Sequence, residues 1–187
     1  MTFPGADASR AEVDAWLAAN PRPPGQMTRT ATFGPGAAHS PYRYTLGRRW
    51  AGGPTVTWVM LNPSTADAYE DDPTIRRCIG FSKAWAFGAL EVVNLFAWRA
   101  TDPRELLTAA EPVGESNDAA IIRSATSASR VVCAWGQHKA IGQRAERVLE
   151  LLRKWSTAER VCLGRTAAGM PRHPLYVRGD VVPEVMP

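Results

Sequence analysis

The chain has 187 residues, 45% of them hydrophobic, and a formal net charge of +4. A chain of this size and composition can bury one hydrophobic core, which excludes general disorder. No apolar run approaches the roughly 20 residues that span a bilayer, and the first ten residues lack a secretory pattern. We therefore expect a cytoplasmic protein outside the membrane, with a charge compatible with a polyanionic partner.

The three cysteines, Cys78, Cys133 and Cys162, lie far apart inside apolar segments. Metal and redox sites usually pair their cysteines closely or place them beside histidines. We expect three reduced core residues, and we predict neither a metal nor a cofactor.

The N-terminal residues 1–30 are predicted to form an appendage to a single α/β domain over residues 31–187. Ser9 begins a capping-box pattern, so a short helix is expected to end before Pro21. The proline-rich residues 21–25 then form a stiff linker.

The domain itself is predicted to open with an antiparallel strand pair, Tyr42–Leu46 and Thr55–Leu61, joined by a Gly-Gly-Pro turn. Helices and strands then alternate. Further strands are predicted at 90–96, 130–135 and 161–163, and helices at 73–87, from 102, at 117–127 with Asn117 as its cap, and at 140–155. This order predicts a three-layer sandwich with a mainly parallel central sheet of about four core strands plus an antiparallel extension.

Polar residues follow each predicted core strand, and ligands in such folds bind beyond the carboxyl ends of the strands. In chain order, these residues are Asn62, Ser64, Thr65 and Asp67, then Asn94 and Arg99, then Gln137 and His138, and finally His173. We expect Asn62, Asn94 and His173 to share one cleft. Asn94 interrupts an apolar run, where a buried amide without partners costs a few kcal/mol.

Each of these residues also has a structural interpretation. Asn62 before Pro63 is typical of a turn, Ser64 and Asp67 have nearly the spacing of a helix cap, and a lone loop histidine such as His173 often serves packing. The sequence alone leaves both interpretations open.

Four motifs, MLNPSTAD, VVNLFAWRATDP, VVCAWG and GRTAAGMPRHPLY, resemble a bacterial and phage family of unassigned function, domain of unknown function 1643, over about residues 42–178. Their order and spacing also resemble the uracil-DNA glycosylase superfamily. That superfamily has a water-handling loop like Leu61–Ser64, a base-reading asparagine like Asn94, a strand ending like Trp135-Gly136, and a His-Pro loop like His173-Pro174.

The chain departs from that superfamily at two motifs. Asn62 stands directly before the proline, where the strong glycosylases have an aspartate, and Asp67 comes later. The His-Pro motif continues with Leu175 and Tyr176 instead of serine or alanine. Three scattered cysteines also cannot hold the iron-sulfur cluster of one branch.

The resemblance implies a uracil-DNA glycosylase-like fold and an N-glycosylase that hydrolyses the bond to a modified, damaged or deaminated base. It implies that Asn62 holds the water, with Asp67 nearby, and that His173 donates to the leaving base. The implied substrate-binding residues are Ser64 and Thr65 for a phosphate, Asn94 and Phe81 or Phe96 for the base, and Arg99 and Arg172 for the rest of the substrate.

The expected partner is a nucleic acid, DNA first, or a nucleotide, bound by a monomer. Three alternatives remain open at this point: a binding module of the same fold without chemistry, a hydrolase of a free nucleotide, and an enzyme acting on an unrelated small substrate.

Overall fold

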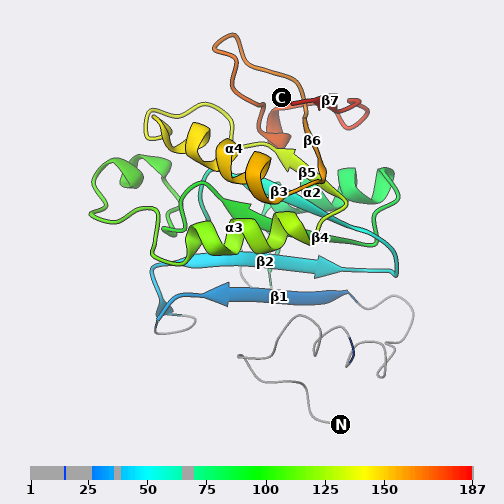
Figure 1. Cartoon of the computed structure of the whole chain (residues 1–187), viewed down its shortest axis with the longest axis horizontal. Helices are drawn as coiled ribbons and strands as arrows, with labels where there is room; N and C mark the ends of the chain where they lie inside the picture. Colours follow the sequence, from blue (N-terminus) through cyan, green and yellow to red (C-terminus); the bar gives the residue numbers. More distant parts are fainter. Residues whose placement is uncertain (1–14, 16–26, 36–38, 65–69, 187) are drawn as a thin grey trace.

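The computed structural model describes residues 15, 27–35, 39–64 and 70–186 (Figure 1). Within them, one seven-stranded sheet has the order β1-β2-β4-β3-β5-β6-β7. The strands are β1 (Thr28–Phe33), β2 (Arg43–Arg49), β3 (Thr55–Met60), β4 (Ala89–Asn94), β5 (Arg130–Cys133), β6 (Glu159–Cys162) and β7 (Glu184–Val185). The central strands β4, β3, β5 and β6 are parallel, and the edge strands are antiparallel.

Helices cover both faces of this sheet, as the alternation of elements predicted. The described helices are α2 (Pro73–Ala84), α3 (Asn117–Thr126) and α4 (Arg144–Trp155), with short 3-10 helices η2 (Pro103–Leu107) and η3 (Pro174–Tyr176). The α3 and α4 helices lie together in front of the sheet in Figure 1, and α2 lies behind it. All six residues of β3 are buried, as expected for a central parallel strand covered on both sides.

The ends of α2 follow from its sequence. The Asp72 carboxylate accepts a hydrogen bond from the Ile75 N–H at 2.7 Å, and Pro73 occupies the first turn. The helix ends earlier than predicted because Ala86 takes a left-handed conformation, with φ of 61°. The N–H groups of Ala86 and Phe87 then donate to the carbonyls of Lys83 and Ser82, which closes the helix.

The predicted pairing of Tyr42–Leu46 with Thr55–Leu61 is wrong, because β4 lies between β2 and β3. Leu46 of β2 pairs with Val92 of β4 in antiparallel register, and β1 pairs with the other side of β2. Gly88, just before β4, donates to the carbonyl of Pro54 and accepts from Trp50 and Ala51. The Gly-Gly-Pro segment therefore crosses the start of β4 instead of making a tight hairpin.

Two other sequence predictions are revised at the domain boundary and at α3. The sheet begins at Thr28, before the boundary predicted at residue 31, because β1 adds to β2. The predicted N-terminal helix and linker lie outside the described residues apart from Ala15. Ser116, not Asn117, is the cap residue of α3; the Asn117 amide is buried and donates to the carbonyls of Asn94 and Leu95, both at 3.0 Å.

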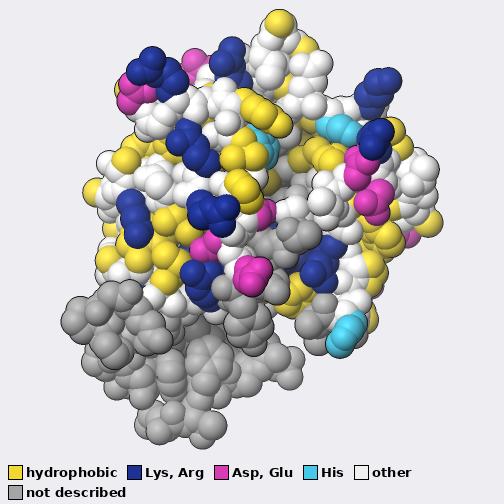
Figure 2. Space-filling view, turned by 180° about the vertical axis from the view of Figure 1, so that it is seen from behind, with side chains coloured by type: hydrophobic (Ala, Val, Ile, Leu, Met, Phe, Trp, Pro, Cys, Tyr) yellow, Lys and Arg dark blue, Asp and Glu magenta, His cyan; other side chains and the backbone are white. Residues whose placement is uncertain are grey.

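On the face shown in Figure 2, the described positive charges are scattered. Figure 2 shows the side opposite to Figure 1, and on its described part Lys and Arg side chains lie among hydrophobic and acidic ones without forming a continuous stripe. None of the helices in the described ranges combines the length and apolar character needed to cross a membrane.

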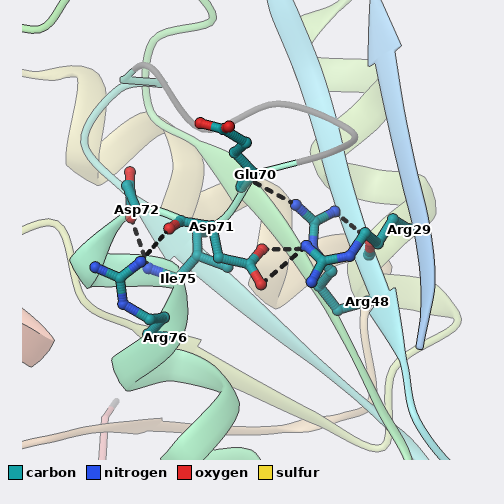
Figure 3. Close-up of polar contacts among 8 residues, drawn as sticks. Arg29, Arg48, Glu70, Asp71, Asp72, Ile75 and Arg76 are labelled. Atoms are coloured by element: carbon teal, nitrogen blue, oxygen red, sulfur yellow. Dashed lines mark hydrogen bonds and ion pairs between the residues drawn. The ribbon is translucent and has the colours of Figure 1, made fainter. Parts of the chain in front are cut away.

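A buried ion pair ties the segment before α2 to the sheet (Figure 3). The Arg48 side chain is fully buried, and its Nε donates to the Asp71 carboxylate at 2.7 Å. The other Asp71 oxygen lies 2.9 Å from Nη1 of Arg29 on β1. Arg48 also donates to the carbonyls of Gly47 and Glu70, so its guanidinium joins β2 to the residues that precede α2.

We expect Asp71→Ala to lower the free energy of unfolding by about 3 kcal/mol, because it leaves one partner of a buried ion pair behind. Urea denaturation followed by circular dichroism measures the loss. The matched control is Asp180→Ala, which removes an exposed ion pair with Arg178 and should change stability little. Equal stability of the two variants would contradict the anchoring role.

Candidate functional site

A cleft of about 730 Å³ lies at the carboxyl ends of the parallel strands. It is lined by residues that end or follow β3, β4, β5 and β6, and by the first turn of α2. The crossover after β3 runs through α2 on one face, whereas the crossover after β5 runs through α4 on the other. This divergence of neighbouring connections opens a crevice, which is the usual ligand position in open α/β sheets.

Five of the residues with a predicted catalytic or substrate-binding role line this cleft: Asn62, Ser64, Asn94, Arg172 and His173. Gln137 and His138, which follow β5, line it as well. Two predicted residues, Thr65 and Asp67, lie outside the described residues. The segments that follow four different strands therefore do converge at one edge of the sheet.

Phe81 and Phe96 do not line the cleft, so the predicted stacking of either ring on a ligand there needs correcting. Phe81 is turned toward the sheet and packs against Trp58 and Trp85, with ring centroids 6.1 and 5.5 Å away. Phe96 is buried in the hydrophobic cluster beneath α3 and α4. Their apolar surface makes both rings part of the core.

Arg99 is also absent from the cleft lining. Its Nη1 donates to the carbonyl of Ser40 at 3.3 Å, and its guanidinium lies 5.3 Å from the ring centre of Phe33 on β1. The loop after β4 carries this side chain toward the β1 and β2 edge, away from the predicted substrate contacts.

Asn62 holds two loops together at the end of β3. Its Nδ2 donates to the carbonyl of Pro63 at 3.0 Å and to that of Ala100, in the loop after β4, at 2.8 Å. Both amide hydrogens are thus used within the protein. Only Oδ1 remains for the water-holding role that the resemblance implied.

Asn94 ends β4, and the residue is 2% exposed. Asn94 pairs with Met60 of β3, and its side chain lies on the same face of the sheet as that of Val92, two residues earlier on β4. Met60 and Val92 both line the cleft. The Asn94 Nδ2 is buried and has no hydrogen-bond partner among the described residues. An unmet buried donor in a cleft wall is unusual, because nearly all buried polar groups in folded proteins are paired.

His173 is held in one tautomer by the loop that carries it. Its Nδ1 accepts from the Leu175 N–H at 3.4 Å, which leaves the proton on Nε2. Burial lowers the pKa of His173 from its usual value of 6.5, so the ring is neutral near pH 7. Arg77 of α2 fixes the same loop by donating to the carbonyls of Pro174, at 3.3 Å, and Val177.

Asp72 also lines the cleft, although its position directly before Pro73 in the sequence indicates no more than a helix cap. Besides the Ile75 N–H, its carboxylate accepts a hydrogen bond from the Ser64 hydroxyl. Its negative charge raises the pKa of His173, against the larger effect of burial. A crossover helix that follows a parallel strand starts at the carboxyl edge of the sheet, so its capping carboxylate belongs to the ligand-binding edge.

The described ranges contain no group of three or more His, Cys, Asp and Glu side chains arranged to hold a metal ion. The three cysteines are free and buried. Burial raises the pKa of the Cys133 thiol to about 12, so this thiol is protonated and unreactive near neutral pH. The polar groups that line the cleft are instead amides, imidazoles, hydroxyls, one carboxylate and arginines.

A family model described as "Protein of unknown function (DUF1643)" matches residues 43–175. The chain belongs to the DUF1643 family. Neither the curated proteins nor the solved structures include a significant match to it. The DUF1643 region runs from β2 into η3 and contains every cleft-lining residue named above, from Met60 to His173.

We expect an NMR titration to give His173 a pKa below 6.5, and Asp72→Asn to lower it further, because that variant removes the charge that opposes burial. Asparagine also caps helices, so α2 should persist. Stability carried by neutral His173 is present above pH 6.5 and is lost as the pH falls through the lower folded-state pKa.

The matched control is Asp118→Asn on α3, which should leave the His173 pKa unchanged. His173→Gln identifies the signal among the three histidines. A His173 pKa at or above 6.5, or a His173 pKa that Asp72→Asn leaves unchanged, would disprove this electrostatic arrangement.

Proposed function

We propose that this DUF1643 protein is an N-glycosylase-like hydrolase that releases a modified, damaged or deaminated base from nucleic acid, with DNA as the first candidate. One observation carries the proposal: neutral His173, the Asp72 carboxylate and Asn94, whose Nδ2 has no partner among the described residues, line the same cleft. Together they supply a hydrogen-bond donor for the leaving base, a negative charge, and an amide that can form hydrogen bonds with the edge of a base.

The proposed reaction breaks the bond between the sugar C1′ and the base nitrogen. The electron pair leaves with the base, so negative charge develops on the base and positive charge on the sugar. Nε2 of His173 donates a hydrogen bond to the departing base, which stabilises its negative charge. Water adds to C1′, and the proton it loses ends on the base.

Asp72 is the proposed carboxylate for the sugar side of this reaction. Hydrogen bonds from Ser64 and from the Ile75 N–H fix its orientation at the start of α2. A fixed negative charge there would stabilise the developing positive charge on the sugar and orient the attacking water. This assignment replaces the aspartate that glycosylases have before the proline, where this chain has Asn62.

The resemblance of four ordered motifs to the uracil-DNA glycosylase superfamily also supports the proposal, and we propose that the fold is related as well. In both cases an asparagine ends the second core strand and a His-Pro loop follows the fourth, represented here by Asn94 and His173-Pro174. A base must leave the duplex stack to enter such a cleft, at a cost of a few kcal/mol.

The same reaction on a free nucleotide is the second candidate. The distribution of positive charge on the face in Figure 2 supports it. Lys and Arg side chains are scattered over the described face in Figure 2, without a continuous stripe that would follow a long phosphate backbone. Contacts to a few phosphates around one nucleotide fit this distribution.

The test is base release from single- and double-stranded DNA that contains uracil, hypoxanthine, alkylated or hypermodified bases, with free nucleotides in parallel, detected as abasic sites or free base. We expect release from at least one substrate. His173→Ala should then lower the rate by on the order of 10²–10³, with little change in substrate affinity.

The exposed histidine His39, outside the cleft, provides the matched control, and His39→Ala should keep the full rate. Binding that weakens steeply with salt, without release from any substrate, would indicate a binding module without chemistry. A His173→Ala variant that keeps the full rate would remove His173 from the mechanism.

A further inference from the structure

The start of α2 already holds a carboxylate. A helix N-terminus binds phosphate through N–H groups that have no partner inside the helix. In α2, Pro73 has no N–H, and the Ile75 N–H donates to the Asp72 carboxylate at 2.7 Å. The Ser64 hydroxyl donates to the same carboxylate. A phosphate beside Ser64, where the resemblance implied one, would therefore meet a negative charge and two donors that are already in use.

The loops after β5 and β6 bring a different set of side chains to the cleft. These polar residues are Gln137, His138, Thr166 and Arg172. The two loops touch, because the Gly136 N–H donates to the carbonyl of Pro171 at 2.9 Å. Chain length from this contact limits the distance between the Cα atoms of His138 and Arg172 to roughly 15 Å. Both side chains can therefore reach one small group in the cleft.

Two of these side chains have a hydrogen-bond donor available for a ligand. Nδ1 of His138 accepts from the Ala140 N–H at 3.2 Å, so the ring proton lies on Nε2. Oγ1 of Thr166 accepts from the Met170 N–H at 3.2 Å, which leaves the hydroxyl proton to donate elsewhere. Backbone contacts thus orient both groups as donors.

Arg172 adds a positive charge to these donors. Its Nε donates to the carbonyl of Arg165 at 3.1 Å, and among the described residues no carboxylate lies within ion-pair distance of its guanidinium. Asp102 is a carboxylate close to His138, but it is paired with Arg104. Hydrogen bonds from Arg104 are the main reason that the pKa of Asp102 lies below its usual value, and the charge of His138 lowers it further. The loops after β5 and β6 therefore combine a guanidinium with neutral donors, which is a set that suits phosphate.

We propose that the loops after β5 and β6 form a phosphate subsite, in which Arg172 and Nε2 of His138 bind a phosphate group of a nucleotide. The Thr166 hydroxyl and the Gln137 amide are further donors in this subsite. The inference deepens the proposed function and rests on it only for the phosphate being part of a nucleotide. It uses none of the groups that hold Asp72, which the proposed reaction assigns to the sugar.

The experiment titrates the full chain with inorganic phosphate at constant ionic strength and follows the ring signals of the three histidines by NMR. We expect the His138 signals, identified with His138→Gln, to shift on binding, while those of the exposed His39 stay in place. Deoxyuridine 5′-monophosphate and deoxyadenosine 5′-monophosphate should compete with phosphate, and the two nucleosides should not. Arg172→Gln should weaken phosphate binding about tenfold, as for the loss of a hydrogen bond to a charged group.

Arg178→Gln is the matched control, because it removes the same charge from an exposed arginine outside the cleft. Ser64→Ala tests the alternative position at the start of α2. Both variants should keep the phosphate affinity of the wild type. Phosphate binding that Ser64→Ala weakens and Arg172→Gln leaves unchanged would overturn the inference. Equal weakening by Arg178→Gln and Arg172→Gln, His138 signals that do not respond, or no phosphate binding would overturn it as well.

A short single-stranded oligodeoxynucleotide, used as a competitor, identifies the source of the phosphate. Competition by the monophosphates alone indicates a free nucleotide, and stronger competition by the oligonucleotide indicates a strand; both results support the subsite. These measurements do not need a glycosidic bond to break. Phosphate binding that depends on Arg172, without base release from any substrate, would support the inference and refute the proposed function. Base release without phosphate binding would do the reverse.

Discussion

The cleft depends on the buried ion pair between Arg48 and Asp71. A fully buried guanidinium needs an anion beside it, and Asp71 meets that need from the segment that leads into α2. With Asp71 fixed toward β1 and β2, the adjacent Asp72 begins α2 and lines the cleft. Two neighbouring carboxylates therefore have different surroundings, one bound to arginines and the other capping a helix at the ligand-binding edge.

The α2 helix, which the Arg48–Asp71 ion pair holds at its start, also positions the loop after β6. Its first turn carries Asp72, and further along Arg77 holds the carbonyls of Pro174 and Val177 on either side of η3. His173 immediately precedes η3, so the carboxylate and the imidazole are positioned by the same helix. The loop after β5 also contacts the His173 loop, because the Gly136 N–H donates to the carbonyl of Pro171. A Cβ atom at Gly136 would lie only 3.3 Å from the Cβ of His173, so a side chain at this position would crowd the histidine.

The sequence predicted those parts of the fold that are recorded in local patterns. Buried runs alternating with amphipathic helices predicted the four parallel strands, and the carboxyl ends of these strands predicted that Asn94 and His173 would line one cleft. The position of β2 was not predictable in this way, because insertion of β4 is decided by distant backbone pairing. Asp72 was missed because a capping pattern accounts for it completely, and Phe81 was misassigned because aromatic side chains suit a core and a ligand site equally well.

Insertion of β4 between β2 and β3 has a consequence for how the chain folds. Strands that follow each other closely in sequence usually pair early as a hairpin, at little cost in loop entropy. Here β2 and β3 each pair with β4, so β2 has only β1 as a local partner and β3 has no strand partner until the chain has passed through α2. Until β4 docks, the β2 and β3 edges that it will occupy therefore remain open to incorrect partners.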